Sequence, residues 1–401
     1  MQVTIAPQKA CGTVKAPPSK SMAHRLLICA AMANGESLVD GVSMSEDVSA
    51  TLDCLSALGV SYSKDGGRVQ LSGIDMTKAV PNGGLYCRES GSTLRFMIPI
   101  ALLSGREVTL CGAPSLMKRP MGVYEALCRE KDLYFLQKNH AITVKGHLPA
   151  GEYVLPGDVS SQFITGLLFA LTNVGESRIR VLPPFESRSY VDLTLSALRD
   201  FGATVEWEDD FTLYIPKKAD FHATACEVEG DYSNAAFLDA LTVVGGDVRV
   251  EGLRPDSLQG DRVYKAYFEA LQKGTPTLDL RDCPDLAPIL FALAAAGHGG
   301  VFEGTRRLRI KESDRAAVMA EELAKFGTRV TVEEDRVTVD PVAFHAPSVP
   351  LCGHNDHRIV MSMAVLCTKV GGTVTGAEAV KKSYPNFFND LSTLGVESVV
   401  S

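Results

Sequence analysis

Several short clusters along the chain combine basic side chains with hydroxyl groups, a combination that suits the binding of phosphate and carboxylate groups. In Ser19–Arg25, Ser21 and Arg25 are four residues apart and share one face of a helix, with Lys20 just before the first turn. Lysine binds such anions as a point charge and arginine through a planar fork of donors. A capping serine beside solvated basic residues would give the same pattern, so this cluster alone leaves both interpretations open.

Two further clusters place small or neutral polar residues where an apolar run begins. In Glu89–Arg95, Gly91 would allow backbone N–H groups to approach a ligand closely. Ser160, Ser161 and Gln162 supply three hydrogen-bonding side chains at another helix start, whereas capping explains only one serine. A plain capped turn remains open for both. The chain has no GxxxxGKS/T motif, which excludes a nucleotide-binding P-loop.

Charged residues gather at two later helix starts. Glu312 stands between Lys311 and Arg315, so it is either part of a surface ion network or an acid with a tuned proton affinity. The run His354–Arg358 invites a metal interpretation, but no third or fourth ligand is suggested by spacing elsewhere. We therefore expect no metal here and interpret Arg358 as an anion receptor.

The clusters recur at regular intervals, each followed by an apolar helical run. The marker residues are separated by 71, 69, 72, 52 and 71 positions: Ser21, Ser92, Ser161, Ser233, Asp285 and Asp356. Helix starts present unpaired N–H groups and attract anions. Six repeats of about 70 residues, none able to cover its own apolar helix, suggest two domains of three repeats each.

A second helix in most repeats is amphipathic and ends in glycine. We expect a left-handed residue at each of these positions: Gly59, Gly202, Gly274, Gly327 and Gly395. The alternation in Thr328–Val332 and Arg336–Val339 predicts a hairpin. The repeat is therefore an α+β module with one buried and one half-exposed helix.

Composition narrows the class of protein. The 401 residues carry a net charge of −8, with 45% hydrophobic and 22% charged residues, as in ordinary globular proteins. No apolar run is long enough to span a membrane, and the first residues lack the pattern of a secretion signal. Ten cysteines without a C-x-x-C pair suit reduced thiols. We expect a cytoplasmic enzyme or binding protein, and the acidic balance argues against a nucleic-acid binder.

The clusters taken together resemble those of 5-enolpyruvylshikimate-3-phosphate synthase. The resemblance runs from about Gly12 to Leu394 and rests on the joint order of these strings: APPSKSMAHR, ESGSTLRF, KRPM, VSSQF, ESRSY, PDLAP, IKESDR, NDHR and KKSYPNFF. It implies transfer of the enolpyruvyl group of phosphoenolpyruvate to the 5-hydroxyl of shikimate 3-phosphate, with release of phosphate and with no cofactor or metal. It also implies the enolpyruvyl transferase fold: two similar domains, each of three βαβαββ repeats around buried parallel helices.

The resemblance further implies a discontinuous first domain, residues 1–18 plus 228–401, and a second domain, residues 19–227. The active site would lie in the cleft between them and close by a hinge motion. We expect a monomer whose partners are its two small-molecule substrates, without nucleic acid or membrane.

The resemblance also implies the site residues. Shikimate 3-phosphate would contact Lys20, Ser21, Arg25, Ser160, Ser161, Gln162, Ser187, Tyr190, Asp285 and Lys311. Phosphoenolpyruvate would contact Lys20, Gly91, Arg119, Gln162, Arg315, Arg358 and Lys382. Asp285 would take the hydroxyl proton and Glu312 would protonate the methylene carbon, with Lys20 sharing proton transfer. Lys20, Arg119 and Lys382 would stabilise the leaving phosphate.

The chain departs from the family pattern at Arg307, where many relatives have Asn, and at Ser92, where Thr is usual. Gly91 is retained, so the resemblance predicts inhibition by glyphosate in competition with phosphoenolpyruvate. The nearest alternative is enolpyruvyl transfer to UDP-N-acetylglucosamine, whose family carries a reactive cysteine in a loop before Arg-Pro. Here Cys111 lies eight residues before Arg119. An RNA-end-processing or RNA-binding protein, or an inactive paralogue used for binding, are further alternatives.

Overall fold

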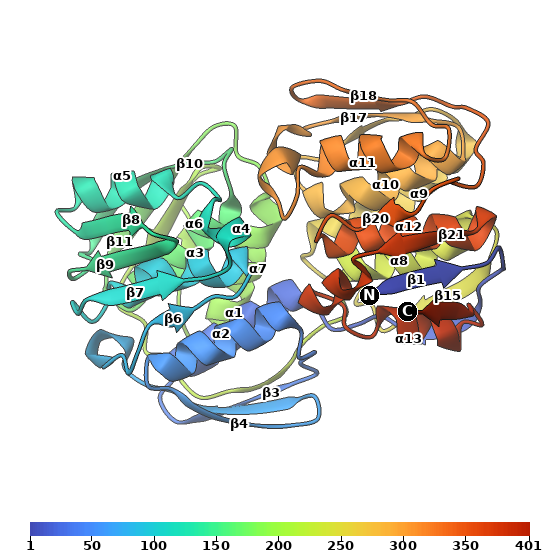
Figure 1. Cartoon of the computed structure of the whole chain (residues 1–401). Coiled ribbons are helices and arrows are strands. Elements are labelled where there is room, and N and C mark those ends of the chain that lie inside the picture. The colour runs from blue at the N-terminus through green and yellow to red at the C-terminus, as the bar shows by residue number, and fades with distance from the viewer. The chain divides into compact units, whose positions relative to one another are not determined.

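The structure, a computed structural model, describes residues 1–401. The chain divides into two compact units (Figure 1). Each unit has its own hydrophobic core. Unit 1 consists of Met1–Ser19 and Gly230–Ser401, and unit 2 of Lys20–Glu229. No helix combines the length and the apolar character that crossing a membrane requires.

Each of the six polar clusters begins a buried helix. These helices are α1 (Lys20–Met32), α3 (Gly91–Ala101) and α6 (Ser161–Leu171) in unit 2, and α8 (Tyr232–Val243), α10 (Ala287–Ala296) and α12 (His357–Val370) in unit 1. In α6 every residue except Gln162 is buried. A helix that is apolar on all sides must be enclosed, so the sequence pattern predicted these core helices.

A second helix follows in each repeat. These are α2 (Glu46–Ala57), α5 (Gly122–Glu130), α7 (Arg188–Asp200), α9 (Tyr264–Lys273), α11 (Arg315–Ala324) and α13 (Phe387–Thr393). Gly59, Gly202, Gly327 and Gly395 have φ between 80° and 105°, as predicted. The prediction for Gly274 was wrong: its φ of 163° is extended, because α9 leads almost directly into the next strand at Thr277.

Three four-stranded sheets of the same order complete unit 2. Their orders are β14-β3-β5-β4, β6-β7-β9-β8 and β10-β11-β13-β12. The strands are β3 (Glu36–Asp40), β4 (Ser61–Asp65), β5 (Arg68–Ser72), β6 (Leu85–Tyr86), β7 (Val108–Cys111), β8 (Tyr134–Lys138), β9 (Ala141–Lys145), β10 (Gly151–Pro156), β11 (Ser177–Leu182), β12 (Glu206–Trp207), β13 (Thr212–Ile215) and β14 (Ala225–Glu227). In each sheet the first two strands are parallel and the last two form an antiparallel pair. The βαβαββ repeat is thus present three times, with β14 closing the first.

Unit 1 has two sheets of that order, β16-β17-β19-β18 and β20-β21-β1-β22, and a parallel pair, β15-β2. The strands are β1 (Gln2–Ile5), β2 (Cys11–Lys15), β15 (Asp247–Glu251), β16 (Thr277–Asp279), β17 (Gly300–Glu303), β18 (Val330–Val332), β19 (Arg336–Val339), β20 (Leu351–Cys352), β21 (Gly372–Thr375) and β22 (Ser398–Val400). The hairpin predicted after Gly327 is β18-β19. The repeat built on the two-stranded sheet lacks a hairpin, which explains the single short interval of 52 residues.

Candidate active site

The start of α1 holds the first group of predicted residues. Lys20 Nζ lies 2.9 Å from Oδ2 of Asp47, in the first turn of α2. Arg25 is buried, and its guanidinium donates to the carbonyls of Ser21 and Tyr190 and to the hydroxyl of Thr194, at 2.6 to 2.9 Å. Burial lowers the pKa of Arg25 to about 10, so the side chain stays charged at neutral pH. Arg25 therefore presents a fixed positive charge that is held by uncharged partners.

Buried hydroxyl groups connect α1 and α2 to the start of α3. His24 Nδ1 lies 2.8 Å from Thr51 Oγ1, and that hydroxyl lies 2.7 Å from Thr93 Oγ1. Thr93 in turn donates to Ser90 Oγ, and Ser90 caps α3 by accepting from the Thr93 amide. Desolvation holds the pKa of His24 well below its ordinary value, with Lys20 and Arg25 adding to the effect. A neutral histidine thus takes part in a hydrogen-bond chain that links the three helices.

Gly91, Arg119 and Gln162 come together in unit 2. A Cβ placed on Gly91 would lie 2.6 Å from Arg119 Nη1 and 3.2 Å from Arg95 Nη1. Arg95 donates to Gln162 Oε1 at 2.7 Å, and Gln162 Nε2 donates to Ser92 Oγ at 2.8 Å. Two guanidinium groups, an amide and a helix start therefore converge beside the one residue without a side chain. This is a suitable site for a small, doubly charged anion.

Hydroxyl groups at two helix starts complete this group. Ser160 caps α6 by accepting from the Gln162 amide, while the neighbouring Ser161 is buried as the first residue of the helix. Ser187 precedes α7 with a left-handed backbone, φ 60°, and Tyr190 follows one turn later. The Tyr190 carbonyl accepts from Arg25, so the α7 start is tied to α1.

Arg315 is the centre of a second group of residues, in unit 1. Its side chain is 1% exposed and pairs with three carboxylates: Asp285 and Glu312 at 2.7 Å and Asp356 at 2.9 Å. Although burial opposes charge, these three acids raise the pKa of Arg315 above its ordinary value. The guanidinium of Arg315 therefore stays protonated, and its positive charge is balanced by the three carboxylates.

Asp285 is held by more than one cation. Besides Arg315, Lys311 Nζ lies 3.4 Å away and Arg358 Nη2 lies 3.1 Å away. Burial would raise the pKa of Asp285, but Arg358, Lys311 and Arg315 outweigh it and hold that pKa well below the ordinary value. The pKa of Lys311 is lowered, chiefly by burial and further by Arg315 and Arg307. In this form Asp285 is an ionised but weak base.

A tight turn before α12 carries the remaining residues of this group. Asp356 caps α12 by accepting from the Arg358 amide, and its other oxygen accepts from Arg315. Lys382, at the end of the 3-10 helix η5 (Ala377–Lys382), donates to the carbonyl of Asn355 at 2.6 Å. The prediction that this run is an anion receptor and not a metal motif stays a prediction.

Sequence reasoning missed three residues of these groups. Arg95 holds Gln162, Asp47 pairs with Lys20, and Asp356 pairs with Arg315. A signal existed for Arg95, which stands four residues after Gly91 on the same helix face. Arg307, in the 3-10 helix η4 (Arg306–Ile310), is buried and donates to the carbonyl of Arg281 at 2.6 Å.

Comparisons with known proteins identify the family and the fold of the chain. The family model described as EPSP synthase (3-phosphoshikimate 1-carboxyvinyltransferase) matches residues 5–391. A curated 3-phosphoshikimate 1-carboxyvinyltransferase of Clostridium kluyveri is 37% identical over 98% of this chain and 97% of that protein. A solved EPSP synthase of Acinetobacter baumannii superposes with a TM-score of 0.80 at 25% identity, covering 100% of this chain and 99% of the other. The enolpyruvyl transferase NikO of Streptomyces tendae, at 14% identity, shares the fold with a TM-score of 0.74, covering 99% and 98%.

Proposed function

The chain belongs to the EPSP synthase family, and we propose that its two groups of site residues act together on shikimate 3-phosphate and phosphoenolpyruvate. The activity is that of a 3-phosphoshikimate 1-carboxyvinyltransferase, a transferase of the shikimate pathway and of aromatic amino-acid biosynthesis. The match of the family model over residues 5–391 carries this conclusion. The enolpyruvyl transferase fold predicted from the sequence is likewise confirmed.

We propose that the unit 2 group binds the anionic groups of both substrates. Arg25 and the hydroxyls of Ser21, Ser160, Ser161, Ser187 and Tyr190 would hold shikimate 3-phosphate, with Gln162 shared. The convergence of Arg119 on Gly91 supports a site for phosphoenolpyruvate there. Lys20, whose ammonium lies 2.9 Å from Oδ2 of Asp47, would face both substrates.

The unit 1 group would supply the acid and base. Arg315, Arg358 and Lys382 would bind phosphoenolpyruvate, and Lys311 would bind shikimate 3-phosphate. Arg358 and Lys311 are among the cations that keep Asp285 a weak base. When substrate anions share these cations, the pKa of Asp285 rises, because its positive neighbours are then neutralised by the ligand. The base would thus be activated only when the substrates are bound.

The reaction then proceeds by addition and elimination. Asp285 takes the proton of the 5-hydroxyl, the oxygen bonds to C2 of phosphoenolpyruvate, and Glu312 protonates C3 to a methyl group. In the second step the Glu312 carboxylate, deprotonated in the first, takes a proton back from the methyl group, the C2–O bond breaks so that phosphate leaves, and the enol double bond is restored. Lys20, Arg119 and Lys382 stabilise the charge on the departing phosphate. Lys20 would share the proton transfers.

The test is a phosphate-release assay with both substrates, with UDP-N-acetylglucosamine as the control acceptor. Lys20→Ala and Glu312→Ala should each lower kcat by about 10²–10⁴-fold, as expected for lost acid–base catalysis. Lys9→Ala and Glu321→Ala, at exposed positions of unit 1, should keep normal turnover. Release of phosphate from phosphoenolpyruvate with the UDP-sugar, but not with shikimate 3-phosphate, would refute the proposed acceptor.

Cys111 does not favour the alternative acceptor, whose family uses a reactive cysteine. Burial and, to a smaller extent, Cys54 raise the pKa of the Cys111 thiol, so this thiol is a poor nucleophile.

We also propose that the enzyme is a monomer of the cytoplasm, without nucleic-acid or membrane partners. The net charge of −8 supports the absence of a nucleic-acid partner, because nucleic-acid-binding proteins usually carry a basic surface. Light scattering after gel filtration tests the oligomeric state: a mass near 43.0 kDa is expected, and a mass near twice that value would contradict it.

A further inference from the structure

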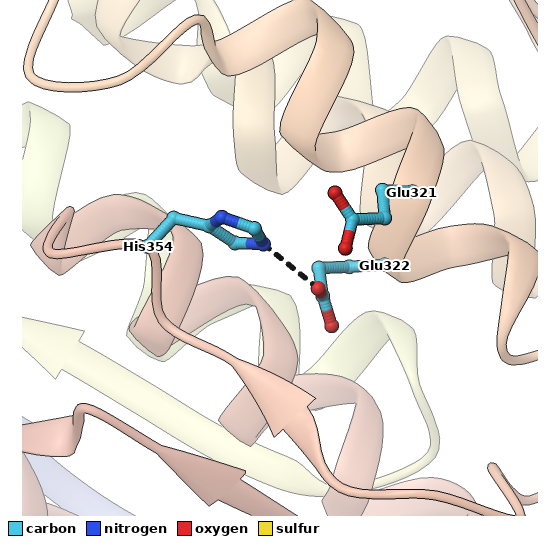
Figure 2. Close-up of side chains that lie close together, drawn as sticks. All are labelled: Glu321, Glu322 and His354. Carbon is cyan, nitrogen blue, oxygen red and sulfur yellow. Dashed lines mark hydrogen bonds and ion pairs between the residues drawn. The ribbon is translucent and has the colours of Figure 1, made fainter.

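Glu322, a buried carboxylate in α11, lies outside both site groups. Both of its oxygens make hydrogen bonds or ion pairs with other residues. Glu322 Oε1 lies 2.8 Å from His354 Nε2, and Oε2 accepts from the Cys352 amide at 2.9 Å. Lys325 Nζ lies 2.8 Å from both oxygens. Figure 2 shows His354 reaching from its turn toward Glu322 on the helix. We call Glu322, Lys325 and His354 the Glu322 clamp.

The clamp is a contact between segments of the chain rather than a metal site. Ligand atoms of Glu321, Glu322 and His354 do lie within 4.8 Å of one another. A carboxylate, however, offers about four lone-pair positions. In Glu322 they serve Lys325 twice, His354 and the Cys352 amide. The ammonium of Lys325 is therefore the cation of this cluster.

The clamp fixes one end of a turn whose other end carries site residues. His354 and Asn355 both have left-handed backbone, with φ of 48° and 54°. Such backbone is uncommon for non-glycine residues, and asparagine and histidine are among the types that adopt it most readily. Directly after His354, the Asn355 carbonyl accepts from Lys382, and Asp356 accepts from Arg315 and caps α12.

We infer that Glu322 and His354 are positioning residues for the phosphoenolpyruvate-binding cations Arg315, Arg358 and Lys382. Neither residue touches substrate in this assignment. Through the turn they set where the Asn355 carbonyl and the Asp356 carboxylate lie. The carbonyl holds Lys382, and the carboxylate holds the Arg315 guanidinium and the backbone amide of Arg358, which begins α12. The inference rests on the proposed function, because it concerns the same site.

Matched variants test this role. Glu321→Gln and Glu322→Gln make the same charge change at adjacent positions, one exposed and one fully buried. We expect Glu322→Gln to lower kcat/KM for phosphoenolpyruvate by about 10–100-fold, as small misplacements of binding groups do. The KM for shikimate 3-phosphate, whose contacts lie mostly in unit 2, should change less than threefold. A merely structural defect would reduce the active fraction and leave both KM values unchanged.

A second pair keeps the test decisive if Glu322→Gln does not fold. In His354→Gln the amide reaches as far as the imidazole Nε2 and can donate to Glu322. In His354→Asn the amide is too short, although asparagine tolerates the left-handed backbone better. We expect His354→Gln to keep near-normal KM for phosphoenolpyruvate and His354→Asn to raise it about tenfold or more.

The outcomes separate the inference from the proposed function. If the unmodified enzyme converts both substrates but His354→Asn and Glu322→Gln match Glu321→Gln in KM, the positioning role is overturned. If His354→Asn is as active as His354→Gln, it is overturned as well. If the unmodified enzyme has no activity with these substrates, the proposed function fails first.

Discussion

The two groups of site residues hold their buried arginines in opposite ways. In unit 2, Arg25 is bound by two carbonyls and a hydroxyl, so its charge is not cancelled. In unit 1, Lys311, Arg315 and Arg358 face the three carboxylates of Asp285, Glu312 and Asp356. An anion can pair with Arg25 directly, because no carboxylate occupies that guanidinium. An anion that binds the unit 1 cations must share them with the three carboxylates. Unit 2 is therefore organised for binding, and unit 1 couples binding to a change in proton affinity.

The largest expected effect of this difference is on stability. Arg315→Met leaves three acids, one of them 0% exposed, without their shared guanidinium. Removing one partner of a buried ion pair costs about 3–5 kcal/mol, and urea unfolding followed by circular dichroism should show a loss of that size. Arg329→Met, which removes an exposed pair partner of Asp340, is the matched control and should show no measurable change. A loss below about 1 kcal/mol in Arg315→Met would contradict the assigned network.

Arg25→Met should have the opposite profile. Its partners keep other bonds, since the Thr194 hydroxyl also bonds to Thr165 and to the Tyr190 carbonyl. We expect a modest loss of stability but a loss of shikimate 3-phosphate affinity of about 10²-fold, because a charge-assisted contact to an anion is removed. Isothermal titration measures the affinity, and Arg129→Met, 77% exposed, serves as control. Equal affinity in the two variants would remove Arg25 from the binding group.

A smaller effect is expected at Gly91. The added Cβ of Gly91→Ala would meet Arg119 Nη1 at 2.6 Å, and the flexible end of that side chain must shift. Weakening one charge-assisted hydrogen bond by about 1.4 kcal/mol raises the KM for phosphoenolpyruvate about tenfold. Glyphosate, if it competes for this position, should lose potency in the same variant. Gly83→Ala, with nothing within 4 Å of the added atom, should keep both constants.

The sequence predicted the repeat and the starts of the buried helices at which the polar clusters stand, because both are local properties. Apolar runs on all sides of a helix require burial, and polar clusters mark where each run begins. It did not predict contacts between distant segments, such as Arg95 with Gln162 or Glu322 with His354. Nor did it predict that β14 pairs with β3, because these two strands are almost 190 residues apart in the sequence. The expected domain boundaries and the roles of the site residues stay predictions.

The last expected effect concerns pH and separates the two units. Desolvation, aided by Lys20 and Arg25, holds the pKa of His24 well below its ordinary value. Below about pH 6.5 the unfolded chain then takes up a proton that the folded chain does not, so stability falls as pH falls, by up to about 1.4 kcal/mol per pH unit. The lowered pKa of Asp285 acts in another window: its stabilisation is complete above about pH 4 and is lost only below. The stability of unit 2 should therefore fall as the pH falls from 6.5 to 5, a range in which Asp285 does not change the stability of unit 1.

Trp207, the single tryptophan, lies in β12 and reports unfolding of unit 2 alone. Its fluorescence in urea should give a lower midpoint at pH 5 than at pH 7. Because glutamine does not titrate, His24→Gln should reduce this difference, while His222→Gln, at an exposed position of the same unit, should keep it. An unchanged pH difference in His24→Gln would show that another group titrates in unit 2, and that the hydroxyl groups linking α1, α2 and α3 do not depend on a neutral histidine.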